Sequence, residues 1–395
     1  MSPEGATTPL RVGTRGSKLA TTQSQQVADL LAAHGVPAQL AIVTTTGDVT
    51  SGPLAQMGGT GVFAAALRQE LLSGGVDLAV HSLKDLPTQD AFDGALALVH
   101  PPREDPRDAL VARDGLSLKE LPAGAVIGTG SPRRAAQIRA LRPDCAIADV
   151  RGNVGTRLSR VRGLEHHGAT DIGVGRETRG DLDAVVLAAS GLARLGLSAV
   201  VTDFLDPHRV LPAAGQGCLA VEYRTAETAP EVLTALRALE DPATRVARSA
   251  RTATRVAVRA ERALLLRLEA GCAAPVGAFA QLETDDAGNT VLVLEAVVAD
   301  PRDSGMQSSE GHSSGNQGPE ILRETARTPL PAGFPGVDAA TETPGARSGE
   351  VSGRVPGPEP LEQAERAAAR LGTELAETLL GRGADRYTGA EAGRA

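Results

Sequence analysis

The sequence predicts an α/β protein with two hinged doubly wound domains followed by a small α+β domain. Three observations support this prediction. Strand-like apolar runs alternate with helix-like segments over residues 10–102, and the same alternation begins again after a charged, proline-containing link at residues 103–108. Beyond residue 240 the order changes to helix, two strands and a final helix. A chain of 395 residues is long enough for roughly two to three such domains.

The composition is that of a globular protein. Hydrophobic residues make up 42% of the chain and charged residues 22%. The formal charge of −8 argues against non-specific nucleic-acid binding. Tryptophan is absent and aromatic residues are only 2%, which disfavours stacking platforms for single-stranded nucleic acid. We therefore expect no nucleic-acid partner.

The cysteines point to a reducing compartment. Cys145, Cys218 and Cys272 form neither a CxxC pair nor an even set for disulfides. The amino terminus lacks a basic region followed by an apolar core, and no apolar run reaches the length of a membrane span. We expect a cytoplasmic protein with no membrane partner.

The first domain is expected over residues 1–102 and 216–238. Its elements alternate as βαβαβ, with strands at residues 10–14, 38–44 and 76–82 and helices at 18–34 and 62–73. The polar loops that follow parallel strands lie at one edge of the sheet. Arg15, Ser17 and Asp85 are therefore expected to share one cleft.

The segment from Val76 to Pro87 organises this domain. An almost unbroken apolar run leads into Lys84 and Asp85, and Pro87 then disfavours a helix at the residue before it. A carboxylate held at the carboxyl end of a buried strand is a candidate general acid or base. Taken alone, the segment also fits an ordinary surface ion pair, which is the commoner case.

The second domain is expected over residues 107–211. Its strands are predicted at residues 109–112, 125–129, 146–150 and 184–188, and its helices at 132–141 and 154–162. Residues 166–180 look like a loop insertion, in which His166 and His167 fit a solvated pair better than metal ligands. A strand-like run at 218–221 can return to the first sheet. The chain would then cross twice between the two domains, which would make a hinged, periplasmic-binding-protein-like cleft.

One strand-to-helix turn of this domain has the composition of an anion site. A glycine turn carries Thr129 and Ser131 and leads into Arg133 and Arg134, with Pro132 at a plausible first helical position. Free backbone N–H groups, a hydroxyl and two guanidinium groups converge there.

The next turn repeats the pattern with Arg151 and Arg157. Each turn alone also fits solvated arginines at a helix start. Together with Arg15 they indicate a ligand with several carboxylates or phosphates. No nucleotide P-loop sequence is present.

The third domain is expected over residues 240–395. A ten-residue repeat at 243–257 lengthens a helix, strands follow at 276–281 and 291–298, and a final helix covers 361–380. Residues 300–360 are rich in Gly, Ser, Pro and Glu, which predicts a disordered insertion.

Cys272 follows the carboxyl end of a helix, where the helix dipole does not favour a thiolate. Its surroundings in the sequence therefore make it a poor nucleophile. A half-buried structural cysteine and an exposed point of covalent attachment both remain open.

These segments, taken together, resemble the porphobilinogen deaminase family over about residues 10–298 and the final helix. The motifs that carry the resemblance are Arg15-Gly16-Ser17, His81 to Pro87, Gly128 to Arg134, Arg151 to Leu158, Leu211 to Gly217 and Gly271-Cys272.

The resemblance implies two hinged domains and a third that carries a dipyrromethane cofactor, thioether-linked to Cys272. Four porphobilinogen molecules are joined head to tail with loss of ammonia, and water releases hydroxymethylbilane. Asp85 matches the catalytic carboxylate, and the family is usually monomeric. The matching cofactor- or substrate-binding residues are Arg15, Ser17, Lys84, Thr129, Ser131, Arg133, Arg134, Arg151, Arg157, Arg194 and Gln216.

One departure and two alternatives accompany this interpretation. Thr60 stands in a glycine-rich loop where many relatives have lysine. A non-catalytic hinged binding protein for a polycarboxylate would keep the arginines but have no use for Cys272 or Asp85. A transferase acting on phosphorylated substrates would also need arginines, but the absence of a P-loop or metal pattern counts against it.

Overall fold

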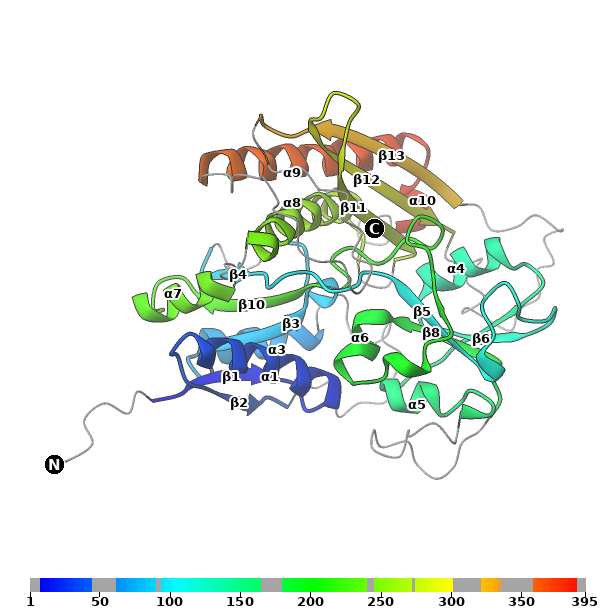
Figure 1. Cartoon of the computed structure of the whole chain (residues 1–395), viewed down its shortest axis with the longest axis horizontal. Helices are drawn as coiled ribbons and strands as arrows, with labels where there is room; N and C mark the ends of the chain where they lie inside the picture. Colours follow the sequence, from blue (N-terminus) through cyan, green and yellow to red (C-terminus); the bar gives the residue numbers. More distant parts are fainter. Residues whose placement is uncertain are drawn as a thin grey trace, which may run out of the picture.

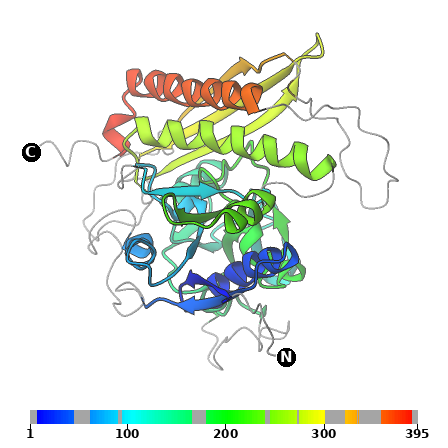
Figure 2. The same ribbon diagram turned by 90° about the vertical axis from the view of Figure 1, so that its left-hand side faces the viewer.

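A computed structural model gives the structure of the chain over residues 8–44, 62–89, 94–164, 180–239, 245–271, 274–300, 321–332, 334 and 358–388. Within these ranges the chain forms three sheets with associated helices (Figures 1 and 2). The predicted class, two sheet-and-helix domains and a small α+β domain, is confirmed. No helix in the described ranges is long and apolar enough to cross a membrane. Thr60, Cys272 and the histidine pair at 166–167 lie outside the described residues.

The first sheet has the order β2-β1-β3-β10-β4. β1 pairs in parallel with β2 and β3, whereas β10 is antiparallel to both β3 and β4. The sheet is therefore mixed, not parallel throughout, because the chain returns from the second domain and inserts β10 between β3 and β4. Its elements are β1 (Leu10–Thr14), α1 (Lys18–Ala33), β2 (Ala38–Ile42), α3 (Val62–Leu72), β3 (Leu78–Ser82), β4 (Leu96–Val99), β10 (Leu219–Arg224) and α7 (Pro230–Leu239).

The second sheet repeats this plan with the order β7-β6-β8-β5-β9. Helix α4 begins and ends as predicted, with Pro132 in its first turn and the Ser131 hydroxyl accepting the N–H of Arg134. Helix α5 is shorter than expected and ends at Leu158. The elements are β5 (Asp108–Ala112), η3 (Arg113–Gly115), β6 (Val126–Gly128), α4 (Pro132–Leu141), β7 (Ala146–Ala148), α5 (Val154–Leu158), β8 (Ala184–Ala188), α6 (Ala189–Arg194), η6 (Ser198–Val200) and β9 (Asp203–Phe204).

Two crossings connect these sheets, at residues 100–107 and 205–218. They lie side by side, because the N–H of Glu104 donates to the carbonyl of Gly217 at 3.0 Å. Gly217 has φ +87°, and a Cβ there would lie 2.6 Å from the carbonyl oxygen of Glu104. Only glycine fits this close approach of two backbones.

The third domain packs two long helices, α8 (Arg245–Arg267) and α9 (Pro358–Gly381), with an antiparallel sheet of β11 (Val276–Thr284), β12 (Thr290–Ala299) and β13 (Ile321–Pro329); the short α10 (Asp385–Thr388) follows. α8 lies between α9 and the first domain (Figures 1 and 2). The prediction of disorder over 300–360 is wrong for 321–329. β13 is an edge strand of largely polar residues, so it lacks the apolar signal of a buried strand.

Candidate active site

The end of β3 places a charged pair at the edge of the first sheet. Residues Leu83–Asp85 form a single 3₁₀ turn, η2, directly after the strand. Leu83 is fully buried, and its N–H donates to the carbonyl of Cys218 at 2.9 Å. Lys84 is half-buried and Asp85 is exposed. The turn thus anchors the apolar side chain of Leu83 inside, holds Lys84 partly buried and leaves the carboxylate of Asp85 exposed.

The end of β1 lies at the same edge, as predicted, since β1 and β3 are parallel. Arg15 and Ser17 follow β1 and are both half-buried. The Ser17 hydroxyl caps α1 by accepting the N–H of Ala20 at 3.3 Å. The Gln23 amide of α1 donates to the Ser82 hydroxyl at 3.2 Å, which ties this helix to the end of β3.

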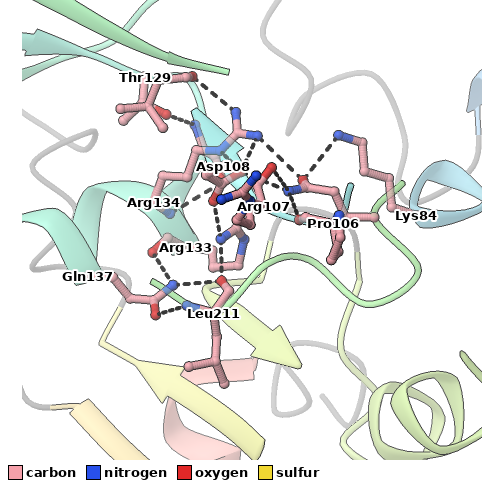
Figure 3. Close-up of polar contacts among 12 residues, drawn as sticks. Lys84, Pro106, Arg107, Asp108, Thr129, Arg133, Arg134, Gln137 and Leu211 are labelled. Carbon is pink, nitrogen blue, oxygen red and sulfur yellow. Dashed lines mark hydrogen bonds and ion pairs between the residues drawn. The ribbon is translucent and has the colours of Figure 1, made fainter. Parts of the chain in front are cut away.

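A buried carboxylate, Asp108, lies at the centre of the junction between the two domains (Figure 3). Arg133 donates to its Oδ2 at 2.8 Å, and Arg134 donates to its Oδ1 at 2.7 Å and 3.0 Å. Burial alone would raise the pKa of Asp108, but the two guanidinium groups prevail and hold it well below its ordinary value. Asp108 is therefore ionised and satisfied.

Arg133 and Arg134 already have protein partners on more than one side. Their exposed fractions are only 3% and 6%. Besides Asp108, Arg133 donates to the carbonyl of Leu211, and Arg134 donates to that of Val186 at 3.2 Å. These arginines form part of the junction between the domains and are not freely accessible at its surface.

Gln216 connects the two halves of the site. Its amide nitrogen donates to Asp108 Oδ1 and to the carbonyl of Pro106, both at 2.8 Å. Its amide oxygen accepts from Lys84 and from Arg134, both at 3.4 Å. The neutral amide of Gln216 thus bonds both to Lys84 of the first domain and to the Asp108–Arg134 pair of the second.

The environment of Lys84 lowers its pKa to about 8. Burial is the main cause, and Arg134 and Arg133 add to it through charge repulsion. The neighbouring Asp85 and the more distant Asp108 act in the opposite direction. Lys84 is a cation at neutral pH that loses its charge only a little above it.

Thr129 and Ser131 shape the turn before α4. Thr129 is buried, and its hydroxyl accepts the N–H of Ser131 at 3.2 Å.

Arg151 and Arg157 flank the start of α5. Arg151 is exposed and pairs with Asp149 at 2.9 Å. Arg157 is half-buried and donates to the carbonyl of Gly152 at 2.9 Å, and burial and the charge of Arg134 lower its pKa.

Arg194 joins the second domain to both crossings. Its guanidinium pairs with Glu104 at 3.0 Å and donates to the carbonyl of Gly217 at 3.1 Å. The side chain is almost fully buried. Like Arg133, it is occupied by protein acceptors.

A cavity of about 130 Å³ lies between the charged loop of the first domain and the end of α8. Lys84, Pro87 and Thr88 line it on one side, and Arg262 and Gly271 on the other. Cys272 itself is not among the described residues, but its neighbour Gly271 forms part of the cavity wall.

Asp108 and Glu261 were not foreseen from the sequence. Glu261 is fully buried in α8 and accepts hydrogen bonds from Arg103 at 2.7 Å and from the N–H groups of Gly215 and Ala280 at 2.6 Å and 2.9 Å. A sequence signal existed, since this glutamate interrupts the apolar stripe of an amphipathic helix. Among the described residues no group of His, Cys, Asp and Glu could hold a metal ion.

Two family models match the sequence of this chain. Residues 10–231 match the family model described as "Porphobilinogen deaminase, dipyromethane cofactor binding domain", and residues 255–328 match "Porphobilinogen deaminase, C-terminal domain".

Three curated relatives named porphobilinogen deaminase show the extent of the similarity. The protein of Micrococcus luteus is 47% identical, covering 96% of this chain and 95% of that protein. The proteins of Cutibacterium acnes and Nocardia farcinica are 50% and 47% identical and cover 86% and 90% of this chain, and 93% and 97% of their own lengths. Among solved structures, apo YehZ from Escherichia coli aligns over 58% of this chain and 85% of its own with 14% identity and a TM-score of 0.34.

Proposed function

The chain belongs to the porphobilinogen deaminase family, and from this premise we propose how its own residues carry the reaction. Four porphobilinogen molecules are joined head to tail with loss of ammonia, and linear hydroxymethylbilane is released for tetrapyrrole biosynthesis. The match of both family models in order along the chain is the observation that supports this function. The alternative, a non-catalytic binding protein for a polycarboxylate, is not favoured.

The cavity beside Gly271 fits a cofactor that carries carboxylate groups. Lys84 and Arg262 bring two cations to its lining, and the chain reaches Cys272 directly after Gly271. We assign the covalent attachment to the sulfur of Cys272. When bound, the dipyrromethane supplies the nucleophilic pyrrole carbon to which the first substrate is joined.

Asp85 is assigned as the catalytic carboxylate. When the aminomethyl group of porphobilinogen loses ammonia, its C–N bond breaks and positive charge develops on the pyrrole nitrogen. An exposed carboxylate at the end of a rigid strand can stabilise that charge. After the new C–C bond forms, the same carboxylate can accept the proton lost from the ring carbon.

The cationic groups at the junction are assigned to the acetate and propionate groups of the substrate. Arg151 is exposed, and Arg15, Lys84 and Arg157 are half-buried in the structure. Arg133, Arg134 and Arg194 keep protein acceptors, so they would contribute through their remaining N–H groups. The whole assigned set is Arg15, Ser17, Lys84, Thr129, Ser131, Arg133, Arg134, Arg151, Arg157, Arg194 and Gln216.

We also propose three functional units, residues 1–102 with 216–238, 107–211, and 240–395, acting as a monomer in the cytoplasm. The three sheets support this division. The net charge of −8 and the odd number of cysteines support a protein of a reducing compartment with no nucleic-acid or membrane partner.

Intact mass spectrometry tests the assignment of Cys272. The purified protein should carry an added mass of two pyrrole units and colour with an acidic aldehyde reagent, and the Cys272→Ser variant should lack both. A parent protein that stays unmodified after incubation with porphobilinogen would instead favour the polycarboxylate-binding alternative.

A further inference from the structure

The guanidinium of Arg262, on α8 of the third domain, reaches into the first domain. It donates to the carbonyl of Pro87 at 2.7 Å, of Leu86 at 3.1 Å and of Leu83 at 3.4 Å. These carbonyls flank Lys84 and Asp85 on both sides. One side chain therefore holds the backbone of the loop that presents the assigned catalytic carboxylate.

The geometry suits an arginine. Three carbonyls that converge on one point need several donors in a fixed plane, and the guanidinium supplies five. Hydrogen bonds from a charged donor are also stronger than neutral ones. A lysine could reach the same place but would offer a single nitrogen without the planar fork.

The opposite side of the loop is fixed by the second crossing. The N–H of Leu83 donates to the carbonyl of Cys218, and a Cβ on Gly215 would lie 2.9 Å from the Leu83 side chain. These contacts fix where the loop begins. The contacts of Arg262 hold it where it ends, at Leu86 and Pro87, so the turn is held at both ends.

The same helix leads toward the assigned attachment point. α8 ends at Arg267, and the chain continues to Gly271, which lines the cavity together with Lys84 and Arg262. We propose that Arg262 is a positioning residue for Asp85, holding its loop at a fixed place relative to the segment that carries the cofactor. This proposal rests on the proposed function, because it concerns the geometry of that reaction.

Two other arginines of α8 provide the contrast. Arg255 pairs with Glu365 at 2.8 Å and Arg267 pairs with Glu377 at 2.6 Å, both across to α9 within the third domain. Removing either guanidinium removes one ion pair to α9 and leaves the loop contacts in place. Arg267→Gln is thus a matched control for Arg262→Gln, with the same substitution on the same helix.

The experiment compares the parent, Arg262→Gln, Arg262→Lys and Arg267→Gln by porphobilinogen turnover, intact mass and thermal melting. We expect Arg262→Gln to carry the two-pyrrole adduct but to lose about tenfold to a hundredfold in kcat, with KM changed by less than about threefold, because a misplaced catalytic group slows chemistry more than binding. Arg262→Lys should recover part of that loss. Arg267→Gln should match the parent.

Either of two results overturns the proposal. In one, Arg262→Gln and Arg262→Lys, both carrying the adduct, turn over within about twofold of the parent. In the other, kcat falls only together with loss of the adduct or of the melting transition, so that Arg262 is merely structural. A parent that shows neither adduct nor turnover would refute the proposed function instead, and this result is separate from the comparison of the variants.

Discussion

The carboxylate of Glu261 accepts the backbone N–H of Gly215 at 2.6 Å, so a helix of the third domain holds the second crossing directly. The same carboxylate pairs with Arg103 on the first crossing at 2.7 Å. Glu261→Ala should therefore destabilise the protein by about 3 kcal/mol or more, since it leaves a buried guanidinium without its partner. Thermal melting checks this as a lower midpoint.

Glu227→Ala is the matched control for that measurement. Glu227 also pairs with an arginine, Arg224, at 3.0 Å, but its side chain is 70% exposed. Its loss should hardly move the midpoint. Equal midpoints for the two variants would mean that Glu261 does not hold the crossings in solution.

Asp85→Asn should abolish chain elongation and leave the fold intact. The side chain is exposed, and its loop is held by hydrogen bonds of its backbone to Arg262 and Cys218, so the substitution removes a negative charge and a proton acceptor without opening a cavity. Mass spectrometry after addition of porphobilinogen should show no ladder of added units. Normal turnover in this variant would rule out the assigned role of Asp85.

The lowered pKa of Lys84 leads us to expect a loss of substrate affinity at alkaline pH. Its pKa is lowered to about 8, so the ammonium is charged at pH 7 and becomes neutral as the pH rises through that value. If it binds a substrate carboxylate, kcat/KM should fall above about pH 8 through a rise in KM. In Lys84→Arg the cation does not titrate, so a decline that persisted there would have another source.

The lowered pKa of Asp108 leads us to expect that the stability of the protein depends on pH. Its folded pKa lies below the ordinary value of 3.8, so its stabilising effect is present above that value and is lost as the pH falls through the folded pKa. In urea unfolding, Asp108→Asn should be less stable than the parent by a constant amount between pH 7 and about pH 5. The difference should shrink below about pH 4. A gap that widened toward acid would contradict this linkage.

Alanine substitutions at Gly217 and Gly35 distinguish the cost of backbone strain from the cost of steric crowding. Both have positive φ, +87° and +79°, but a Cβ at Gly35 meets nothing within 4 Å, whereas one at Gly217 lies 2.6 Å from the Glu104 carbonyl. Gly35→Ala should cost about 1 kcal/mol from the left-handed backbone alone. Gly217→Ala should cost about 2 kcal/mol more, because the two crossings must move apart. Equal melting midpoints would show that the crossings tolerate separation.

The helices and strands that were predicted correctly are those with strong local signals in the sequence. Helix α4 was located to the residue, with Pro132 at its first position as the sequence indicated. Strands β4 and β9, of four and two residues, were missed. β13 was missed because an edge strand needs no apolar face when its neighbours supply the core.

Some residues of the site were likewise predictable from the sequence, and others were not. The strand-end loops with Arg15, Lys84 and Asp85 follow from the order of parallel strands, so they were predictable. Asp108 was not, because its partners Arg133 and Gln216 lie 25 and 108 residues away and become neighbours only through the fold. In the sequence it stands only as the last residue of the charged link at 103–108.

The insertion of β10 between β3 and β4 also determines the order in which the domains can be completed during synthesis. When the ribosome has made residues up to Phe204, every strand of the second sheet exists, whereas β3 and β4 still lack the strand that joins them. The second domain can therefore close before the first. The loop that carries Asp85 gains its anchor only when Cys218 has been made, so the edge assigned as catalytic is among the last parts of the first two domains to form.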